Sequence, residues 1–96
     1  MPAAPLLSDE EIRERVRGLA HWEVRERTLV RSFTFANFAE AVSFVSSLVA
    51  PADEQNHHPD VTIHWNEVTL SLWTHASGGI TERDLALAQT IDEMTL

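Results

Sequence analysis

The chain has 96 residues, 44% of them hydrophobic and 23% charged, a composition typical of one globular domain rather than of a disordered segment. Its 15 acidic and 7 basic residues give a formal net charge of −8, which argues against direct binding to nucleic acid or to an anionic membrane, because both carry phosphate charges of the same sign. The absence of cysteine excludes disulfides, thiolate nucleophiles and thiolate metal ligands.

The N-terminal residues have neither the basic start nor the long apolar segment of a secretory signal. We expect residues 1–7 to be flexible, and residues 1–96 to form a single domain. No apolar run approaches the roughly 20 residues of a membrane span. Together with the lack of cysteine, these features predict a cytoplasmic protein without membrane contact.

A first helix is predicted over residues 9–17. Ser8 and Glu11 have the spacing of a capping box, in which each side chain accepts a hydrogen bond from the other residue's backbone. Apolar residues recur behind it at helical spacing, beginning with Ile12, and Gly18 provides a stop.

A first hairpin is predicted next. Residues 22–25 and 29–35 are rich in β-branched and aromatic side chains, and Glu26 and Arg27 lie between them. This pattern is typical of two antiparallel strands joined by a short turn.

A second helix is predicted to begin after Asn37, which forms another capping box with Glu40. We expect Pro51 to end this helix, because proline cannot continue the hydrogen-bond ladder, and residues 51–59 to form a loop. The apolar residues at helical spacing predict a buried stripe made of Phe38, Ala41, Val42, Val45 and Val49.

Alternating apolar and polar residues predict a second hairpin over residues 61–75, with Asn66 and Glu67 at its turn. Trp65 continues the alternation of the apolar positions before it, so we expect Trp65 in the core rather than as a stacking platform. By the same alternation, His75 points away from the core. Trp73 shares that uncovered face, where it favours contact with another subunit.

A final helix follows Thr81, which forms a third cap with Asp84, and is expected to run toward Met94. The complete order predicts an α+β fold, a four-stranded antiparallel sheet with three helices on one face in the order α-β-β-α-β-β-α. A chain of this size buries only about two-thirds of its unfolded surface, so we expect a homo-oligomer, a dimer or a tetramer.

Three histidines are the candidate catalytic residues: His57 and His58 in the loop, and His75 at a strand end. Imidazole exchanges protons near neutral pH, and the adjacent pair would serve two different roles because their side chains diverge. Asp53 and Asp84 could orient an imidazole or bind a ligand. Asp84 equally suits the third position of a capped helix whatever the function, so both interpretations stay open.

Other sites are less well supported. Clustered histidines could bind zinc with an acidic residue, but an adjacent pair is poorly placed to chelate one ion, so we expect no metal. The sequence has no nucleophile-elbow serine and no glycine-rich phosphate loop. His21 and His64 are interpreted as solvated surface residues.

The chain resembles the pterin-4a-carbinolamine dehydratase family over about residues 20–95. The likeness is carried by Trp22, Phe33-Thr34-Phe35, Asp53, His57-His58-Pro59, Trp65-Asn66-Glu67-Val68, Thr74-His75 and Gly79-Ile80-Thr81-Glu82-Arg83-Asp84. The resemblance implies the family's four-stranded sheet with three helices on one face, assembled into dimers or tetramers.

The implied reaction is the loss of water from a 4a-hydroxytetrahydropterin to give a quinonoid dihydropterin, which supports recycling of tetrahydropterin. His57 and His75 would act as acids on opposite faces of the ring, and His58 would orient it. The pterin is the substrate, so no cofactor is expected. The resemblance implies substrate contacts from Trp22, Asp53, His57, His58, Pro59, Thr74, His75, Ala76, Ser77 and Asp84.

Two residues depart from the family's pattern. Val61 stands where many relatives have an aromatic residue, and Trp73 stands where a small residue often precedes Thr-His. Both changes affect pocket walls or assembly and leave the proton-transfer groups in place. The alternative function is a non-catalytic protein-binding module that acts as a dimerisation cofactor or coactivator.

Overall fold

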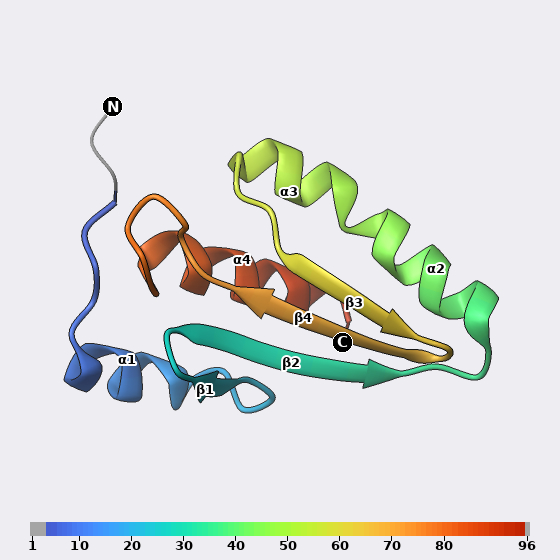
Figure 1. Cartoon of the computed structure of the whole chain (residues 1–96), viewed down its shortest axis with the longest axis horizontal. Coiled ribbons are helices and arrows are strands. Elements are labelled where there is room, and N and C mark those ends of the chain that lie inside the picture. Colours follow the sequence, from blue (N-terminus) through green and yellow to red (C-terminus); the bar gives the residue numbers. More distant parts are fainter. Residues whose placement is uncertain (1–3, 96) are drawn as a thin grey trace.

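An antiparallel sheet with helices on one face forms the framework of the computed structural model, which describes residues 4–95 (Figure 1). The sheet order is β1 (Glu23–Arg25), β2 (Thr28–Thr34), β4 (Glu67–Leu72) and β3 (Asp60–His64). The helices are α1 (Asp9–Val16), α2 (Phe38–Ser47), α3 (Val49–Gln55) and α4 (Glu82–Met94). Because α2 and α3 join end to end, the element order confirms the predicted α-β-β-α-β-β-α arrangement.

Side-chain caps fix where the first and last helices begin. At α1, the Ser8 hydroxyl accepts from the N–H of Glu11, and the Glu11 carboxylate accepts from the N–H of Ser8. At α4, Thr81 accepts from the N–H of Arg83, and Asp84 accepts from the N–H of Thr81. These two of the three predicted capping boxes are confirmed. At α2 the box is only half formed, because Oδ1 of Asn37 accepts from the N–H of Glu40 at 2.9 Å but the Glu40 carboxylate accepts from the N–H of Ala36.

The sheet brings the two hairpins side by side. The first hairpin turns at Glu26 and Arg27, as predicted, since Arg25 pairs with Thr28. Strand β2 then pairs along its length with β4 of the second hairpin, which leaves β1 and β3 as the two edges.

The second hairpin turns one residue earlier than predicted. His64 pairs with Glu67, so Trp65 and Asn66 form the turn, and the strand alternation ends before it reaches the tryptophan. Trp65 has a positive φ of 55° and is 65% exposed. The prediction that Trp65 lies in the core is therefore wrong. Hydrogen bonds between Asn66 and the backbone of Phe35 hold the turn against the end of β2.

A single core lies between the sheet and the helices. Three leucines of the central strands, Leu29, Leu70 and Leu72, are fully buried in it. The phenylalanine rings of Phe33, Phe35 and Phe44 pack together at the edge of this core, with centroids 4.6 to 6.3 Å apart. Val68 of β4 is buried with the leucines, and the remaining members come from the helices and their flanks and are Ile12, Trp22, Ala41, Leu48, Ile80, Leu85, Leu87, Ala88 and Ile91.

The buried face of α2 and α3 differs from the predicted stripe. Three predicted members face solvent: Phe38, Val42 and Val49, which are 54%, 40% and 58% exposed. Both sides of these helices are apolar, so the hydrophobic period alone could not decide which side packs inward. The residues that face the core are Ala41, Phe44, Val45, Leu48 and Ala52.

Pro51 does not end the helical segment, contrary to the prediction. It lies in the first turn of α3, where backbone N–H groups have no partner within the helix, so its missing N–H costs little. The proline ring would clash with the carbonyl four residues earlier, at Ser47, and α2 ends at that residue. The break at Leu48 is therefore the structural effect of Pro51, and residues 51–55 are helix rather than loop.

Part of the N-terminal segment contacts the domain. Of residues 1–7, which we expected to be flexible, 1–3 lie outside the described residues. The N–H of Leu7 donates to the carbonyl of Ile80 at 3.1 Å, and the Ser77 hydroxyl donates to the carbonyl of Ala4. Within residues 4–95, no helix combines the length and apolar character that crossing a membrane requires.

Candidate active site

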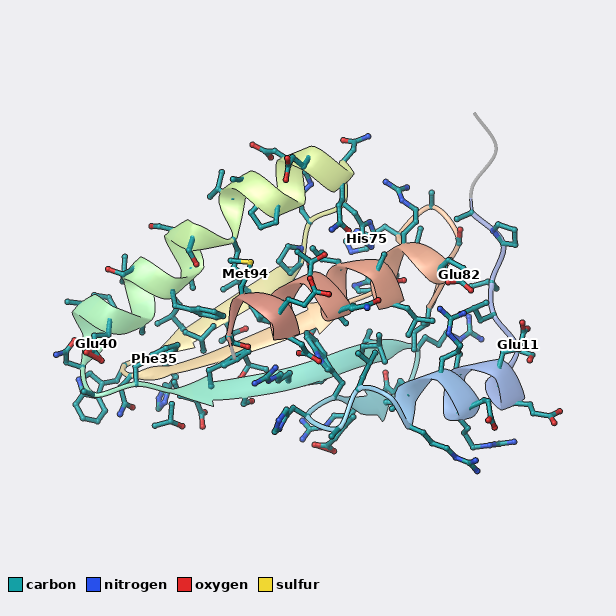
Figure 2. The ribbon with its side chains drawn as sticks, turned by 180° about the vertical axis from the view of Figure 1, so that it is seen from behind. Glu11, Phe35, Glu40, His75, Glu82 and Met94 are labelled. Atoms are coloured by element: carbon teal, nitrogen blue, oxygen red, sulfur yellow. The ribbon has the colours of Figure 1, made fainter. Side chains whose placement is uncertain are left out.

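The three predicted catalytic histidines line one pocket of about 280 Å³. His57 and His58 come from the loop between α3 and β3, and His75 comes from the segment just after β4. Figure 2 shows His75 beside the N-terminal end of α4, far from Met94 at the other end of that helix. The other lining residues are Asn56, Pro59, Asp60, Trp73, Thr74, Ala76 and Arg83.

The end of α3 presents the histidine pair. Asn56 adopts the left-handed conformation, with φ 50° and ψ 42°, which asparagine tolerates better than most residues. The N–H of His57 then returns to the carbonyl of Ala52 at 3.0 Å, so the chain turns sharply away from the helix axis. Pro59 keeps His58 out of helical geometry, and β3 starts at the next residue.

His57 is the buried histidine of the pocket. Its side chain is 8% exposed, and its Nε2 lies 2.6 Å from Oδ1 of Asp84, which is fully buried. A carboxylate oxygen accepts hydrogen bonds, so we assign the proton of the neutral ring to Nε2. Nδ1 is then the nitrogen that is available to a ligand.

Asp84 is held by a chain of hydroxyl groups. Its Oδ2 accepts from the N–H of Thr81 and from the hydroxyl of Thr74, both at 2.9 Å. Since Thr74 gives its proton to Asp84, the Thr81 hydroxyl must donate to Thr74 at 2.7 Å. The Thr81 oxygen accepts in turn from the N–H of Arg83. All these hydrogen bonds run in one direction, from the start of α4 to the carboxylate that holds His57.

His58 and Asp53 form a second pair at the rim of the pocket. Nε2 of His58 lies 2.9 Å from Oδ1 of Asp53 across the end of α3. Their side chains are 59% and 66% exposed, so this pair is screened by solvent. Asp53 therefore orients His58 more than it contributes to stability.

His75 lies against Asp60 and Trp73. Its Nε2 is 3.5 Å from Oδ2 of Asp60, and its ring centroid is 3.9 Å from the centroid of the Trp73 indole, with the planes inclined by 37°. The indole Nε1–H of Trp73 donates to the same Asp60 oxygen at 2.8 Å. Trp73, which we predicted on the uncovered face of the sheet, forms part of the wall of the pocket.

Each imidazole of the pocket therefore has its own carboxylate: Asp84 for His57, Asp53 for His58 and Asp60 for His75. A carboxylate beside a histidine fixes which nitrogen carries the proton and stabilises the charged ring. Three such pairs around one pocket are suited to moving protons to and from a bound ligand.

Two of the predicted substrate-binding residues are already engaged elsewhere. Trp22 is buried, and its indole N–H donates to Asp92, in the last part of α4, at 2.7 Å. Ser77 lies in the turn after His75 and donates to a backbone carbonyl of the N-terminal segment. The structure does not bring either residue to the pocket. Thr74 does line the pocket, and its hydroxyl donates to Asp84. Pro59 and Ala76 do line the pocket, as predicted.

Sequence reasoning missed Asp60, Trp73 and Arg83 as pocket residues. Asp60 directly follows the His-His-Pro motif at the start of a strand, which was the available signal for it. Trp73 was noted as a residue of the uncovered face and as a departure that affects pocket walls or assembly, but not as a site residue. Arg83 stood in a motif that carries the resemblance, but its place in the sequence did not show that its guanidinium donates to the carbonyl of Asn56 beside the pocket.

A second groove, of about 470 Å³, lies between α1 and α4 and has no histidine. Arg15 and Glu82, which line it, are paired with each other, with one N···O distance of 2.9 Å. This groove lacks the proton-transfer groups of the histidine pocket. Among residues 4–95, no group of three or more His, Cys, Asp and Glu side chains is arranged to hold a metal ion.

Comparison with known proteins agrees with the geometry of the histidine pocket. Residues 5–94 match the family model of pterin 4 alpha carbinolamine dehydratase. A protein of Trichodesmium erythraeum is 43% identical over 90 residues, which are 94% of this chain and 97% of the relative. A protein of Thermomicrobium roseum is 46% identical over 88 residues, which are 92% of this chain and 95% of the relative. Both are described as "Putative pterin-4-alpha-carbinolamine dehydratase".

Two solved structures share the fold. A transcriptional coactivator/pterin dehydratase from Brucella melitensis superposes with a TM-score of 0.85 at 30% identity, covering 92% of this chain and 96% of that one. A pterin dehydratase-like protein described as a RuBisCO assembly factor in the alpha-carboxysome gives a TM-score of 0.59 at 24% identity, covering 76% and 84%. The latter likeness concerns the fold alone. By its sequence over nearly its full length, the chain belongs to the pterin-4-alpha-carbinolamine dehydratase family.

Proposed function

We propose that the protein removes water from a 4a-hydroxytetrahydropterin to give a quinonoid dihydropterin, by histidine acid and base catalysis. The C4a–O bond breaks, the hydroxyl leaves as water after it gains a proton, and a ring nitrogen loses a proton. Both proton transfers need groups that can gain and lose a proton near neutral pH, and imidazoles supply such groups. By regenerating a dihydropterin that can be reduced, the reaction would support pterin recycling.

The observation that carries this proposal is the convergence of three histidines, each beside its own carboxylate, on one pocket. The pocket's volume of about 280 Å³ lies near the lower end of the roughly 300 to 1,000 Å³ that is typical of small-molecule sites. A compact bicyclic ring suits this volume, with its substituent extending into solvent.

The histidines have different roles in this proposal. His57 and His75 approach from different elements, so each can serve a hydroxyl on one face of the flat ring as its acid. His58 binds and orients the pterin from the exposed rim, held by Asp53. The reaction needs no cofactor, because the pterin itself carries the group that leaves.

The test is to follow quinonoid dihydropterin formation from freshly made carbinolamine, with and without the protein. Replacing His57 or His75 with Ala should lower kcat by about 100-fold, the smaller end of what general acid catalysis contributes, and change KM much less. His64→Ala is the matched control, because His64 is an exposed histidine at the end of β3 that does not line the pocket. Unchanged rates in both pocket variants would refute the roles assigned here.

Self-association is part of the proposal. Phe38, Val42 and Val49 lie four and seven residues apart along α2 and α3, and all three are exposed. This is the spacing of a helix seam that packs against another helix. The partner we propose is a second copy of the chain, because a two-fold interface uses the same patch on both subunits.

A protein-binding module is the second candidate function. The exposed apolar seam on α2 and α3 would serve such a role, and the Brucella melitensis protein is described both as a coactivator and as a dehydratase. The carbinolamine assay separates the two candidates. Absent dehydratase activity, together with a hetero-partner found by native mass measurement, would favour the binding module.

A further inference from the structure

His75 is an exposed residue that nothing in the core immobilises. Its side chain is 61% exposed, and it lies in the segment between β4 and α4. A free imidazole at such a position samples several rotamers and loses orientation as a proton donor. Two neighbouring side chains, which the proposed reaction does not use directly, remove this freedom.

The first neighbour is Trp73. Alternate residues of an extended chain point to the same side, so the side chains at 73 and 75 meet. The indole covers one face of the imidazole at a centroid distance of 3.9 Å and an inclination of 37°. This contact leaves the opposite face of the His75 ring for a ligand.

The second neighbour is Asp60. It pairs with Ser71 in the register of β3 and β4, which places its side chain on the same sheet face as Trp73, two residues further along β4. One oxygen, Oδ2, accepts the Trp73 indole N–H at 2.8 Å and lies 3.5 Å from Nε2 of His75. The indole N–H of Trp73 thus orients the Asp60 carboxylate, and this carboxylate in turn contacts the Nε2 edge of the His75 ring.

We propose that Trp73 and Asp60 are positioning residues that fix the orientation of His75, a role that deepens the proposed dehydratase function and rests on it. With one ring face against the indole and Nε2 at the carboxylate, His75 presents Nδ1 and its free face in a single orientation. A defined orientation of this kind lowers the barrier to proton transfer, because no rotamer search precedes the reaction.

The surroundings of His75 are charged from several elements. Asp60 comes from β3, His57 and His58 come from the loop before it, and Arg83 comes from α4, and all of them line the same pocket. Among these groups, Asp60 is the one that forms an ion-pair contact with the His75 ring.

Tryptophan fluorescence tests the contact without any pterin. A charged imidazole in contact with an indole quenches its emission more than a neutral one, so emission should fall as the pH drops through the histidine range. Trp73→Phe and His75→Gln should each abolish this pH-dependent loss. Trp65→Phe, which removes an exposed indole in the β3–β4 turn, should retain it.

Kinetics test the consequence of the contact. Trp73→Phe keeps an aromatic face but loses the N–H that holds Asp60, so kcat should fall about tenfold with KM nearly unchanged. Asp60→Asn should lower kcat by a similar factor, and Trp65→Phe should have the same kcat as the parent. Quenching that survives in Trp73→Phe or in His75→Gln overturns the proposal, and so does an unchanged kcat in both Trp73→Phe and Asp60→Asn. If the fluorescence pattern holds but the parent protein does not dehydrate the carbinolamine, the contact stands and the dehydratase function fails.

Discussion

Asp84 is the residue on which the buried half of the pocket depends. Its carboxylate has no exposed surface, and it accepts hydrogen bonds from the His57 ring, the Thr74 hydroxyl and the Thr81 backbone. A charged group out of contact with water is tolerated only when such partners replace the solvent. The same three contacts therefore satisfy the buried carboxylate and fix the orientation of the His57 ring, so the capping role of Asp84 and its contact with a histidine occur together in one residue.

Removing one of these partners should be measurable as lost stability. In Thr74→Val the shape is kept but one hydrogen bond to the buried carboxylate is lost, and we expect the free energy of unfolding to fall by about 1 to 3 kcal/mol. Urea unfolding of the purified variant provides the measurement. Thr74→Ser, which keeps the hydroxyl, is the matched control and should lose less. A Thr74→Val variant as stable as the parent, or a Thr74→Ser variant that loses as much as Thr74→Val, would contradict the importance of this hydroxyl.

That three histidines meet in one pocket could be predicted from sequence, but part of their surroundings could not. The motif around His57 and His58, together with His75 at a strand end, carried the prediction because residue type and spacing are visible in one dimension. Asp60 and Trp73 join the pocket through the pairing of β3 with β4, and this register is a three-dimensional property. Trp22 was predicted to contact the substrate, but its indole N–H donates to Asp92 instead. These residues are 70 positions apart, so the sequence alone did not reveal the contact.

Among the elements, α3 is the one that carries the histidine pair to the pocket. Its last turn ends at Asn56 in the left-handed region. Most residues with a Cβ atom, alanine included, are strained in this conformation, and asparagine tolerates it better. The direction of the loop that holds His57 and His58 depends on this single backbone geometry.

Substitutions at Asn56 should separate backbone strain from side-chain loss. Asn56→Ala should destabilise the protein by about 1 kcal/mol, whereas Asn56→Gly should be tolerated because glycine enters the left-handed region without strain. Thermal unfolding of both variants measures the difference. A glycine variant as unstable as the alanine variant would contradict this account of the helix end.

Helix α1 is tied to the start of α4 by the ion pair between Arg15 and Glu82. The hydrogen bond from Arg15 lowers the pKa of Glu82 below the ordinary value of a glutamate. A lowered pKa in the folded state means that the pair's contribution is complete above the unfolded pKa and is lost as the pH falls through the folded pKa.

Glu82→Gln should therefore destabilise the protein near neutral pH and not in acid. Because both side chains are about half exposed or more, the loss should be small, about 0.2 to 1 kcal/mol. Urea unfolding of the variant and the parent at neutral pH, and again below the glutamate range, measures the difference. If the difference in free energy of unfolding between the variant and the parent persists in acid, the ion pair is not its cause.

The helix starts at Ser8 and Thr81, which side-chain caps set, were predicted correctly, whereas features that depend on packing were not. The caps at Ser8 and Thr81 are decided within four residues, so the sequence contains all the information that sets them. The inward face of α2 and the turn at Trp65 are decided by contacts with the sheet. A helix with two apolar faces cannot reveal from its own sequence which face is buried.

For the whole molecule, the central question is what covers the exposed seam of α2 and α3. Monomeric proteins rarely expose a contiguous row of large apolar side chains, and the neighbouring β3 is a free sheet edge. A second chain packed along this side would cover the seam and add to the modest burial available to a domain of 96 residues.

Val42→Glu should weaken self-association by placing a charge in the middle of the seam. We expect the parent to sediment as a dimer or a tetramer and the variant to shift toward a single chain, because a buried unpaired carboxylate is costly. Val24→Glu is a matched control, since Val24 is 41% exposed against 40% for Val42 but lies on β1, away from the seam. A parent that sediments as one chain at all concentrations, or a Val42→Glu variant that associates as the parent does, would contradict this interface.

The first turn of α4 links parts of the protein that the sequence keeps far apart. Glu82 binds Arg15 of α1, Arg83 binds the carbonyl of Asn56 at the end of α3, and Asp84 binds His57. Three consecutive residues thus serve as one joint, and fraying of that turn would release all three attachments in a single event. We therefore expect opening of this turn to loosen the pocket and the attachment of the N-terminal helix together.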